Sequence, residues 1–455
     1  MAAQRISNWQ KAAYVALVVP MSALHAPALS MLPALYAKYT GIGVATVGII
    51  LTVTRLFDVV IDPVIGYVSD RTETRWGRRK PWIAVGAVIS MVSVYFWFRP
   101  GPDTGVWYFL FASVAVYLGW TLVEIPHSAW YSELTHDYDE RSTIAGWRTA
   151  AMYVGLLAFT LTPLLPIFPT SELTPQVTAF ASWIVIGLIP ICAGAAIFAV
   201  PRGDSAPPSR PTGLRDVVRA AIRSVPLRIL TVAFGLANVA SGMCGAMYFF
   251  YLDAYLGILD KIAYVGLITT VLGFASTLFW PALINRLGKH RALALTTFST
   301  AATLVAMGLI HRGPYAFPAL MAVFGLSSLL ATGSMITLST MMADAVDYDE
   351  WKTGLNKAGN FFAFSAIYQK VGNVLGGGIA LVIAGAFGFN PRGANGTVAL
   401  VGFFLAFLVL PFILNLVAAF AALRFPITRG AQRAIRSRLA RRARNVEELA
   451  TPLPT

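Results

Sequence analysis

The sequence has 455 residues, of which 57% are hydrophobic and only 12% charged, and its formal net charge is +14. In soluble domains about a quarter of all residues are charged, so a soluble enzyme is excluded. A membrane-spanning helix needs about 20 mostly apolar residues. Stretches such as 183–200 and 398–420 are apolar on every side, whereas the strands of a membrane barrel would alternate polar and apolar residues. The sequence therefore predicts an all-α, polytopic membrane protein.

Twelve transmembrane helices are expected, six on each side of one long polar segment. Their ranges are 12–36, 44–68, 81–99, 106–133, 145–167, 177–200, 227–256, 262–284, 291–311, 315–344, 358–388 and 397–424. The polar segment is rich in proline and serine and is expected to link two halves, with an amphipathic helix near its end. The expected parts are an N-terminal bundle at 1–200, a linker at 201–226, a C-terminal bundle at 227–424 and a basic tail at 425–455.

A weak internal repeat supports two related halves. The sequence GYVSDR at 66–71, with GRR at 77–79, follows the second span. The sequence PALINR at 281–286, with GK at 288–289, follows the eighth. Repeated halves are a common construction of secondary transporters, so two pseudo-symmetric six-helix bundles are expected.

The basic residues fall mostly on one side of this arrangement. If both ends of the chain lie on one side, about 28 of the 35 lysines and arginines lie there and five lie on the other. The positive-inside rule then places both termini in the cytoplasm, with the spans in the plasma (inner) membrane. This distribution accounts for the net charge without nucleic acid, and the basic tail is expected to be solvated or to contact lipid headgroups. No removable signal is expected at 1–11.

The sequence lacks the usual motifs of ATP-driven pumps and membrane proteases. GxxxxGK[ST], HExxH and GxSxG are all absent, and the five histidines stand apart. Cys192 and Cys244 lie in apolar runs and are expected to be packing residues. The acidic cluster at 344–350 is expected to be a solvated helix end. No enzymatic activity, cofactor or resident metal is therefore expected.

Ionisable residues within apolar spans are costly, and they mark candidate functional sites. The second span carries Arg55, Asp58 and Asp62 at spacings that place them on one helix face. Two carboxylates one turn apart are hard to keep ionised unless a cation lies between them. This face therefore predicts a cation or proton site, with Arg55 expected to pair with the carboxylates. Pro63 removes a backbone hydrogen bond and frees the carbonyl of Val59 as a further oxygen ligand.

Three other spans add polar groups to the interior. The fourth span carries Thr121, Glu124 and His127 at three-residue spacing, so its polar face is expected to point inward. Arg148 lies at the start of the fifth span and Lys370 within the eleventh. With the second span they give three positive and three negative charges, so a nearly neutral interior is expected.

Several separate motifs then occur in the order found in a known transporter family. They are RLFDVVIDPVIG at 55–66, RWGRRKPW at 75–82, ELT at 133–135 with DERS at 139–142, and MADAVDY at 342–348 with EWKTG at 350–354. Over roughly residues 10–425 the chain resembles the glycoside-pentoside-hexuronide:cation symporters of the major facilitator superfamily. The resemblance implies the twelve-helix major facilitator fold, alternating access, and a cation site between the second and fourth helices.

The resemblance also implies roles for single residues. The matched cation ligands are Asp58, Asp62 and Thr121. The matched substrate-binding positions are His25, Glu124, Ser128, Arg148 and Lys370. Gating or conformational roles are expected for Asp70, Arg71, Arg78 and Arg141, which belong to the motifs beside the membrane.

Three positions depart from the family pattern. Ile61 stands where the family has an asparagine ligand, so either proton or sodium remains open as the coupling ion. His25 stands in place of a sugar-binding aspartate, and Ser128 in place of the tryptophan that stacks on the sugar. These two departures argue against a galactoside that is bound in the same way.

The expected function is cation-coupled import of a sugar, glycoside or sugar acid by a monomer whose partners are the solute and membrane lipids. Carboxylates suit sugar hydroxyls, whereas His25, Arg148 and Lys370 suit an anionic solute such as a hexuronate. A lysolipid or another amphiphile is an alternative that a cavity open sideways to lipid would favour. A non-transporting receptor or scaffold is a further alternative, but it has no need to hold two carboxylates within the membrane.

Overall fold

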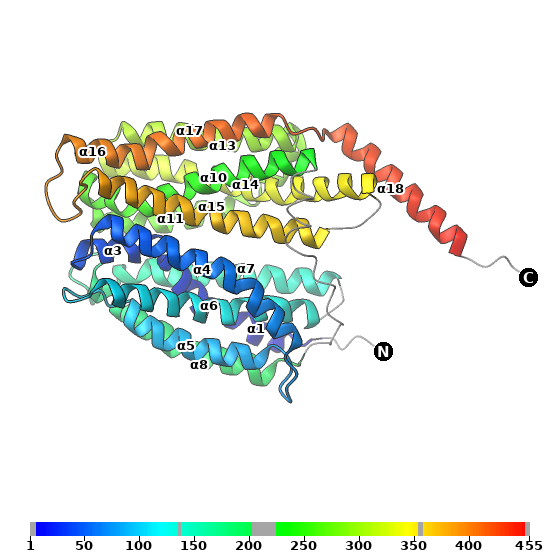
Figure 1. Ribbon diagram of the computed structural model, residues 1–455, viewed down its shortest axis with the longest axis horizontal. Coiled ribbons are helices and arrows are strands. Elements are labelled where there is room, and N and C mark those ends of the chain that lie inside the picture. Colours follow the sequence, from blue (N-terminus) through cyan, green and yellow to red (C-terminus); the bar gives the residue numbers. More distant parts are fainter. Residues whose placement is uncertain (1–5, 135–137, 203–223, 354–357, 451–455) are drawn as a thin grey trace, which may run out of the picture.

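The computed structural model describes residues 6–134, 138–202, 224–353 and 358–450. Within these ranges the chain is helical and contains no strand, which confirms the all-α expectation. The helices form two bundles that lie side by side, one from each half of the chain (Figure 1). The expected linker lies mostly outside the described residues, as does the amphipathic helix expected at its end.

The N-terminal bundle begins with a divided helix. Its first crossing consists of α1 (Asn8–Ala16), α2 (Val18–Ser30) and α3 (Leu32–Tyr39). Pro33 lies in the first turn of α3, where its missing N–H and fixed backbone fit a new helix start. The remaining helices are α4 (Val44–Arg71), α5 (Lys80–Trp97), α6 (Val106–Leu134), α7 (Tyr138–Leu161) with the short η1 (Thr162–Leu164), and α8 (Pro175–Ala199).

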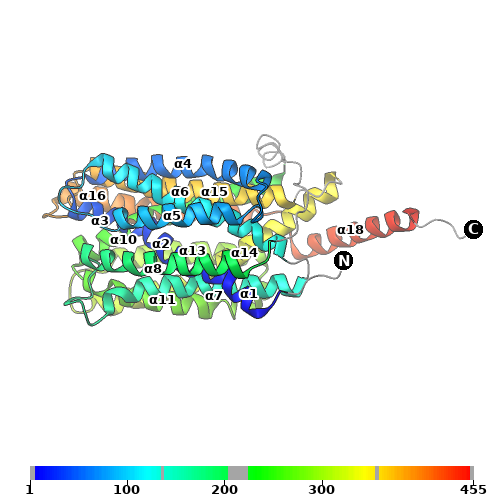
Figure 2. The ribbon, with the colours of Figure 1, turned by 90° about the horizontal axis from the view of Figure 1, so that it is seen from below.

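The C-terminal bundle contains two π-helical turns and one interrupted crossing. Its first helices are α10 (Val225–Phe250) with the π-turn η2 (Tyr251–Leu256), η3 (Leu259–Lys261), α11 (Ile262–Ser276), α12 (Trp280–Leu287) and α13 (Lys289–Gly308). The others are α14 (Ala316–Thr353), α15 (Ala358–Ala386), and α16 (Thr397–Phe404), which continues through the π-turn η4 (Leu405–Val409) into α17 (Leu410–Leu423). The helix α18 (Arg429–Ala450) follows and projects beyond the bundle (Figures 1 and 2).

A helix occupies each of the twelve expected ranges, with three clear differences in their ends. Helix α7 stops at Leu161 rather than 167, because Pro163 disfavours helical backbone in the residue before it and cannot donate to an α-helical ladder. The eighth crossing is interrupted between Ser276 and Trp280, just before a proline in the first turn of α12. Helix α14 continues to Thr353 rather than 344, because a helix does not have to stop where the apolar sequence does.

Nine helices in the described part of the chain are long and apolar enough to cross a membrane. The three other expected crossings correspond to the divided first helix, α7 and α13. The protein is therefore an integral, multi-pass membrane protein.

The two bundles approach closely where α4 packs against α15. A Cβ atom added at Gly48 would lie 2.7 Å from the Cβ of Leu381, and one at Gly385 would lie 2.7 Å from the backbone nitrogen of Ala45. Small residues allow helix backbones to approach closely within a membrane. This close contact brings side chains of α15 within reach of the charged face of α4.

Three polar contacts join the bundles at the end away from α18. Lys38 lies 2.7 and 2.6 Å from the two carboxylate oxygens of Asp253. The Nε atom of Arg392 donates to the carbonyl of Lys38 at 2.6 Å, and the hydroxyl of Ser171 donates to the carbonyl of Asp260 at 2.6 Å. These contacts close the gap between the bundles at this end, which the positive-inside rule predicts to be external.

Removing the Lys38–Asp253 pair is expected to favour opening at this end. A partly exposed ion pair contributes up to about 1 kcal/mol, which corresponds to about a fivefold change in population. In a Cys192→Ser, Cys244→Ser background, a Ser241→Cys probe between the bundles should react up to about fivefold faster with an impermeant maleimide in right-side-out vesicles once Lys38→Met is added. The charge swap Lys38→Asp with Asp253→Lys should restore slow labelling, and an unchanged rate in Lys38→Met would contradict the closing role.

Candidate functional site

A pair of carboxylates on α4 forms the centre of the charged site. Asp58 is buried, at 4% exposure, and Asp62 follows one turn later. The hydroxyl of Thr121 on α6 lies 2.7 Å from Oδ1 of Asp58 and 3.0 Å from Oδ1 of Asp62. The structure therefore brings together the three residues expected to hold the coupling cation.

Lys370 completes this cluster from the opposite bundle. Its ammonium group forms an ion pair with Oδ2 of Asp62 and lies 3.7 Å from Oδ2 of Asp58. The resemblance implies a substrate-binding role for Lys370, but here its described ion pairs are with the carboxylates of α4. A lysine is a cation on a flexible stem. In this structure its charge lies beside both carboxylates, where a coupling ion would neutralise the pair.

A second polar network surrounds Arg148 on α7. Nη2 of Arg148 donates to Oε1 of Glu124 at 2.5 Å and to the hydroxyl of Ser128 at 2.9 Å. The same Ser128 hydroxyl lies 2.7 Å from Oε1 of Glu124. Three of the residues expected to bind substrate thus lie together, but they already form hydrogen bonds with one another.

Tyr14 and His127 occupy the other side of this guanidinium. Nη1 of Arg148 lies 3.0 Å from Nδ1 of His127 and 3.1 Å from the hydroxyl of Tyr14. An arginine only donates, so Nδ1 of His127 must accept. Nε2 then carries the hydrogen and donates to the carbonyl of Tyr14 at 2.9 Å. These bonds assign a neutral tautomer to His127 and use all four terminal N–H groups of Arg148.

Arg55 and His25 contact aromatic rings. The guanidinium of Arg55 lies 3.7 Å from the ring centre of Tyr117, and no ion pair or hydrogen bond of Arg55 occurs among the described residues. The expected charge pairing is present only at longer range, because the side chain turns toward α6 while Asp58 and Asp62 still act on it electrostatically. His25 stacks on Trp120, with ring centres 4.0 Å apart, on the N-terminal wall of the site.

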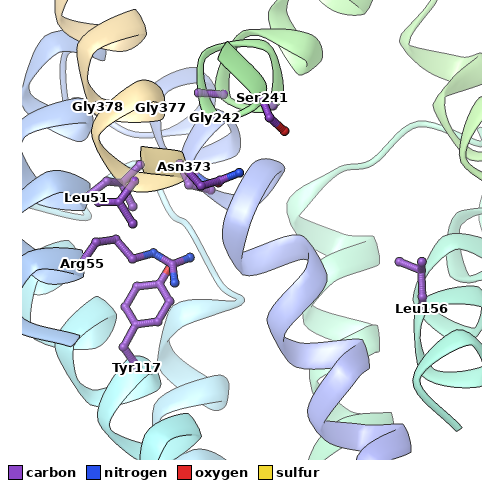
Figure 3. A pocket seen from close by; sticks show the side chains of 13 residues that line it. Leu51, Arg55, Tyr117, Leu156, Ser241, Gly242, Asn373, Gly377 and Gly378 are labelled. Atoms are coloured by element: carbon purple, nitrogen blue, oxygen red, sulfur yellow. The ribbon is translucent and has the colours of Figure 1, made fainter. Parts of the chain in front are cut away.

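A cavity of about 370 Å³ lies between the bundles next to Arg55. Figure 3 shows Arg55 and Tyr117 on one side and Asn373 and Ser241 on helices of the C-terminal bundle. Ser241 also lines two adjoining cavities of about 460 and 360 Å³, whose polar side chains are uncharged. The smaller lies within the C-terminal bundle, whereas Met31, Leu156 and Thr160 of the N-terminal bundle also line the larger. Polar groups of these two cavities include Asn238, Thr269, Thr270, Thr297, Thr300, Ser334 and Asn415.

A separate charge cluster lies near the α18 end of the N-terminal bundle, and Arg79 is at its centre. Arg79 donates to Oε1 of Glu133 from Nη2 at 2.6 Å and to the hydroxyl of Ser69 at 2.9 Å, and it pairs with Asp70 at 2.6 Å. Arg78, which was expected to act here, is 3.8 Å from Glu133. The sequence prediction omitted Arg79 and Glu133, although both lie within the quoted motifs.

The two other expected gating residues are less informative. Arg71 lies over the ring of Tyr67 at 3.6 Å, on the same helix. The side chain of Arg141 lies outside the described part of the structure.

The profile of the family described as MFS/sugar transport protein matches residues 13–429. The chain belongs to this family. The uncharacterized symporter YjmB of Bacillus subtilis is 24% identical over 85% of this chain and 84% of its own length. The glucuronide carrier protein homolog of Escherichia coli is 24% identical over 78% of each chain. The crystal structure of the nucleoside transporter NupG, at 12% identity, covers 92% of this chain and 99% of its own with a TM-score of 0.68.

These findings bear out the major facilitator fold and the expectation of cation-coupled sugar symport. NupG supports the fold alone. Its similarity extends across both bundles, so the two halves of this chain adopt the same overall arrangement as in that transporter.

Proposed function

We propose that this protein imports a sugar or sugar acid by alternating access and couples each solute to one proton. The observation that carries the proposal is the ion pair between Lys370 of one bundle and Asp62 of the other. The family and the glucuronide carrier among its relatives support a sugar-like solute. In this proposal the protein works as a monomer in the inner membrane, with both termini in the cytoplasm and without enzymatic activity or a cofactor.

Binding of the coupling ion would release Lys370. With Lys370 in place, the cluster of two carboxylates and one ammonium carries one net negative charge. A proton on Asp62 removes the charge that attracts Lys370, so the link between α4 and α15 weakens. Because these helices belong to different bundles, the release allows the bundles to move relative to each other around the central cavity.

The geometry at Thr121 favours a proton. A hydroxyl has one hydrogen to donate, but its oxygen can also accept. Thr121 contacts both Asp58 and Asp62, and both contacts are satisfied if one carboxyl group is protonated and donates to the hydroxyl. A sodium ion at the same place would find two carboxylates, one hydroxyl and the carbonyl freed by Pro63, and Ile61 adds no oxygen.

Uptake is therefore expected to follow an acid-outside pH gradient and to persist when choline replaces sodium. Proteoliposomes should accumulate labelled glucuronate or a neutral glycoside under this gradient, and a protonophore should abolish the accumulation. A matched panel with lysophosphatidylcholine tests the amphiphile alternative, and an absence of any accumulation would favour a receptor. If uptake disappears without sodium and returns with millimolar sodium at constant pH, sodium is the coupling ion and Thr121 helps to complete its shell.

A further inference from the structure

Arg55 differs from the other two cations of the interior. Arg148 has Glu124 as its counter-ion, and Lys370 has the carboxylates of Asp58 and Asp62. Arg55 is 7% exposed, and its guanidinium lies over the ring of Tyr117. Asp58 and Asp62 act on it electrostatically, but among the described residues it forms no ion pair or hydrogen bond with either. A buried guanidinium has five N–H groups, and leaving them without acceptors is costly.

The guanidinium is aimed into the cavity between the bundles. Figure 3 shows it extending from α4 over Tyr117 toward the space beneath Asn373. The side chains of Asn373 and Ser241 line the same cavity and, like Arg55, make no hydrogen bond within the described structure. The volume of about 370 Å³ falls in the usual range for a small-molecule site. Three polar side chains from both bundles therefore face one space that is large enough for a monosaccharide.

We propose that Arg55 binds the carboxylate of a sugar acid in this cavity, and that Asn373 and Ser241 receive its hydroxyl groups. This inference rests on the proposed function and deepens it. A guanidinium presents its donors in a fixed fork that matches a carboxylate, and such charge-assisted bonds are stronger than neutral ones. Tyr117 holds the guanidinium in position by stacking beneath it. The solute carboxylate thus meets Arg55 rather than Arg148 or Lys370, whose charges are already paired.

The balance of charge supports the same assignment. Arg55, Arg148 and Lys370 offset the three carboxylates of Asp58, Asp62 and Glu124 when neither ion nor solute is bound. A coupling cation adds one positive charge to this low-dielectric interior, and a solute carboxylate restores neutrality. Each ligand should therefore strengthen the binding of the other, and thermodynamic linkage requires that both affinities change by the same factor.

The test compares binding of matched acidic and neutral sugars to the purified full-length protein in nanodiscs. The probes are D-glucuronate with D-glucose and D-galacturonate with D-galactose, measured by equilibrium dialysis at a pH below neutrality. Arg55→Gln is expected to weaken uronate binding about tenfold or more and to change neutral sugar binding less than about twofold. Arg55→Lys, which keeps the charge but not the fork, should show an intermediate loss. Arg99→Gln at the membrane edge is the matched control and should bind as the original protein does.

The outcomes separate this inference from the proposed function. Selective loss of uronate binding in Arg55→Gln, with Arg55→Lys intermediate, supports the carboxylate role. The carboxylate role is overturned if Arg55→Gln and the original protein bind uronates equally well. It is also overturned if the original protein accumulates sugars with protons but prefers neutral sugars to uronates. If proteoliposomes of the original protein accumulate neither class of sugar under any ion gradient, the proposed function itself is wrong, and the role of Arg55 fails with it.

Discussion

Asp62→Asn is expected to abolish uphill accumulation of solute while solute exchange continues. The asparagine cannot take up a proton, so ion entry is no longer tied to solute entry. Lys370 keeps only Asp58 as a partner, 3.7 Å away, so the cluster has the neutral charge that it has in the protonated protein and the bundles remain able to move. With the membrane potential held at zero, the original protein should reach about tenfold accumulation for each pH unit of gradient, and Asp62→Asn should reach a ratio of about one.

Proteoliposomes loaded with unlabelled solute measure exchange in the same preparation. Asp103→Asn makes the same chemical change at an exposed position and serves as the control. If Asp62→Asn accumulates solute as strongly as the control does, the carboxylate pair has no part in coupling.

Arg148→Met is expected to remove both transport and a large part of the stability. The change leaves the carboxylate of Glu124 within the membrane without its counter-ion. Breaking a fully buried pair costs about 3–5 kcal/mol, which is the upper bound for this partly buried pair. It also removes the donor that Tyr14 and His127 share. The melting temperature in detergent should therefore fall strongly, and solute exchange should fall below detection.

A second variant separates the two effects. Glu124→Gln combined with Arg148→Met leaves no unpaired charge, so it should recover most of the lost melting temperature while transport stays absent. Arg99→Met, at the edge of the N-terminal bundle, controls for removal of an arginine. A stable Arg148→Met protein with normal exchange would mean that the network around Glu124 is dispensable.

The fold was largely predictable because apolar segments in a bilayer have few alternatives to helices. The spans and their order follow from runs of about 20 apolar residues. Helix ends were less predictable where local breaks decided them, as at Pro163 and at the interruption before α12. The extension of α14 to Thr353 also gave no hydropathy signal, because its acidic residues have polar partners in the protein: Asp344 is buried and pairs with Lys289, and Asp347 accepts from Gln432. The expectation of a solvated helix end at 344–350 is therefore wrong for Asp344.

The site was predictable in its members and less so in its pairings. Spacing alone placed Asp58 and Asp62 on one face, and the family resemblance added Thr121. Spacing along one helix cannot show which residues of the other bundle lie opposite, so the partner of Lys370 was missed. The rotamer of Arg55 likewise depends on Tyr117, an aromatic residue of a neighbouring helix that a single sequence does not connect to it.

Tyr14 shows a further limit of sequence reasoning. It lies in the last turn of α1, beside polar residues such as Gln10 and Lys11, and its local sequence carries no functional motif. Its role follows from contacts with His127 and Arg148, which lie more than a hundred residues away in the chain. The charged positions of α6 and α7 were visible in the sequence, but the hydroxyl that completes their network was not.

The most direct test of the account is to measure proton and solute entry together. Proteoliposomes that contain a trapped pH dye receive labelled glucuronate in sodium-free buffer, and internal pH and label are followed in the same sample. One proton is expected to enter with each solute molecule in the original protein, and Asp62→Asn is expected to exchange solute without any pH change. Solute entry without internal acidification in the original protein, or acidification that survives Asp62→Asn, would contradict it.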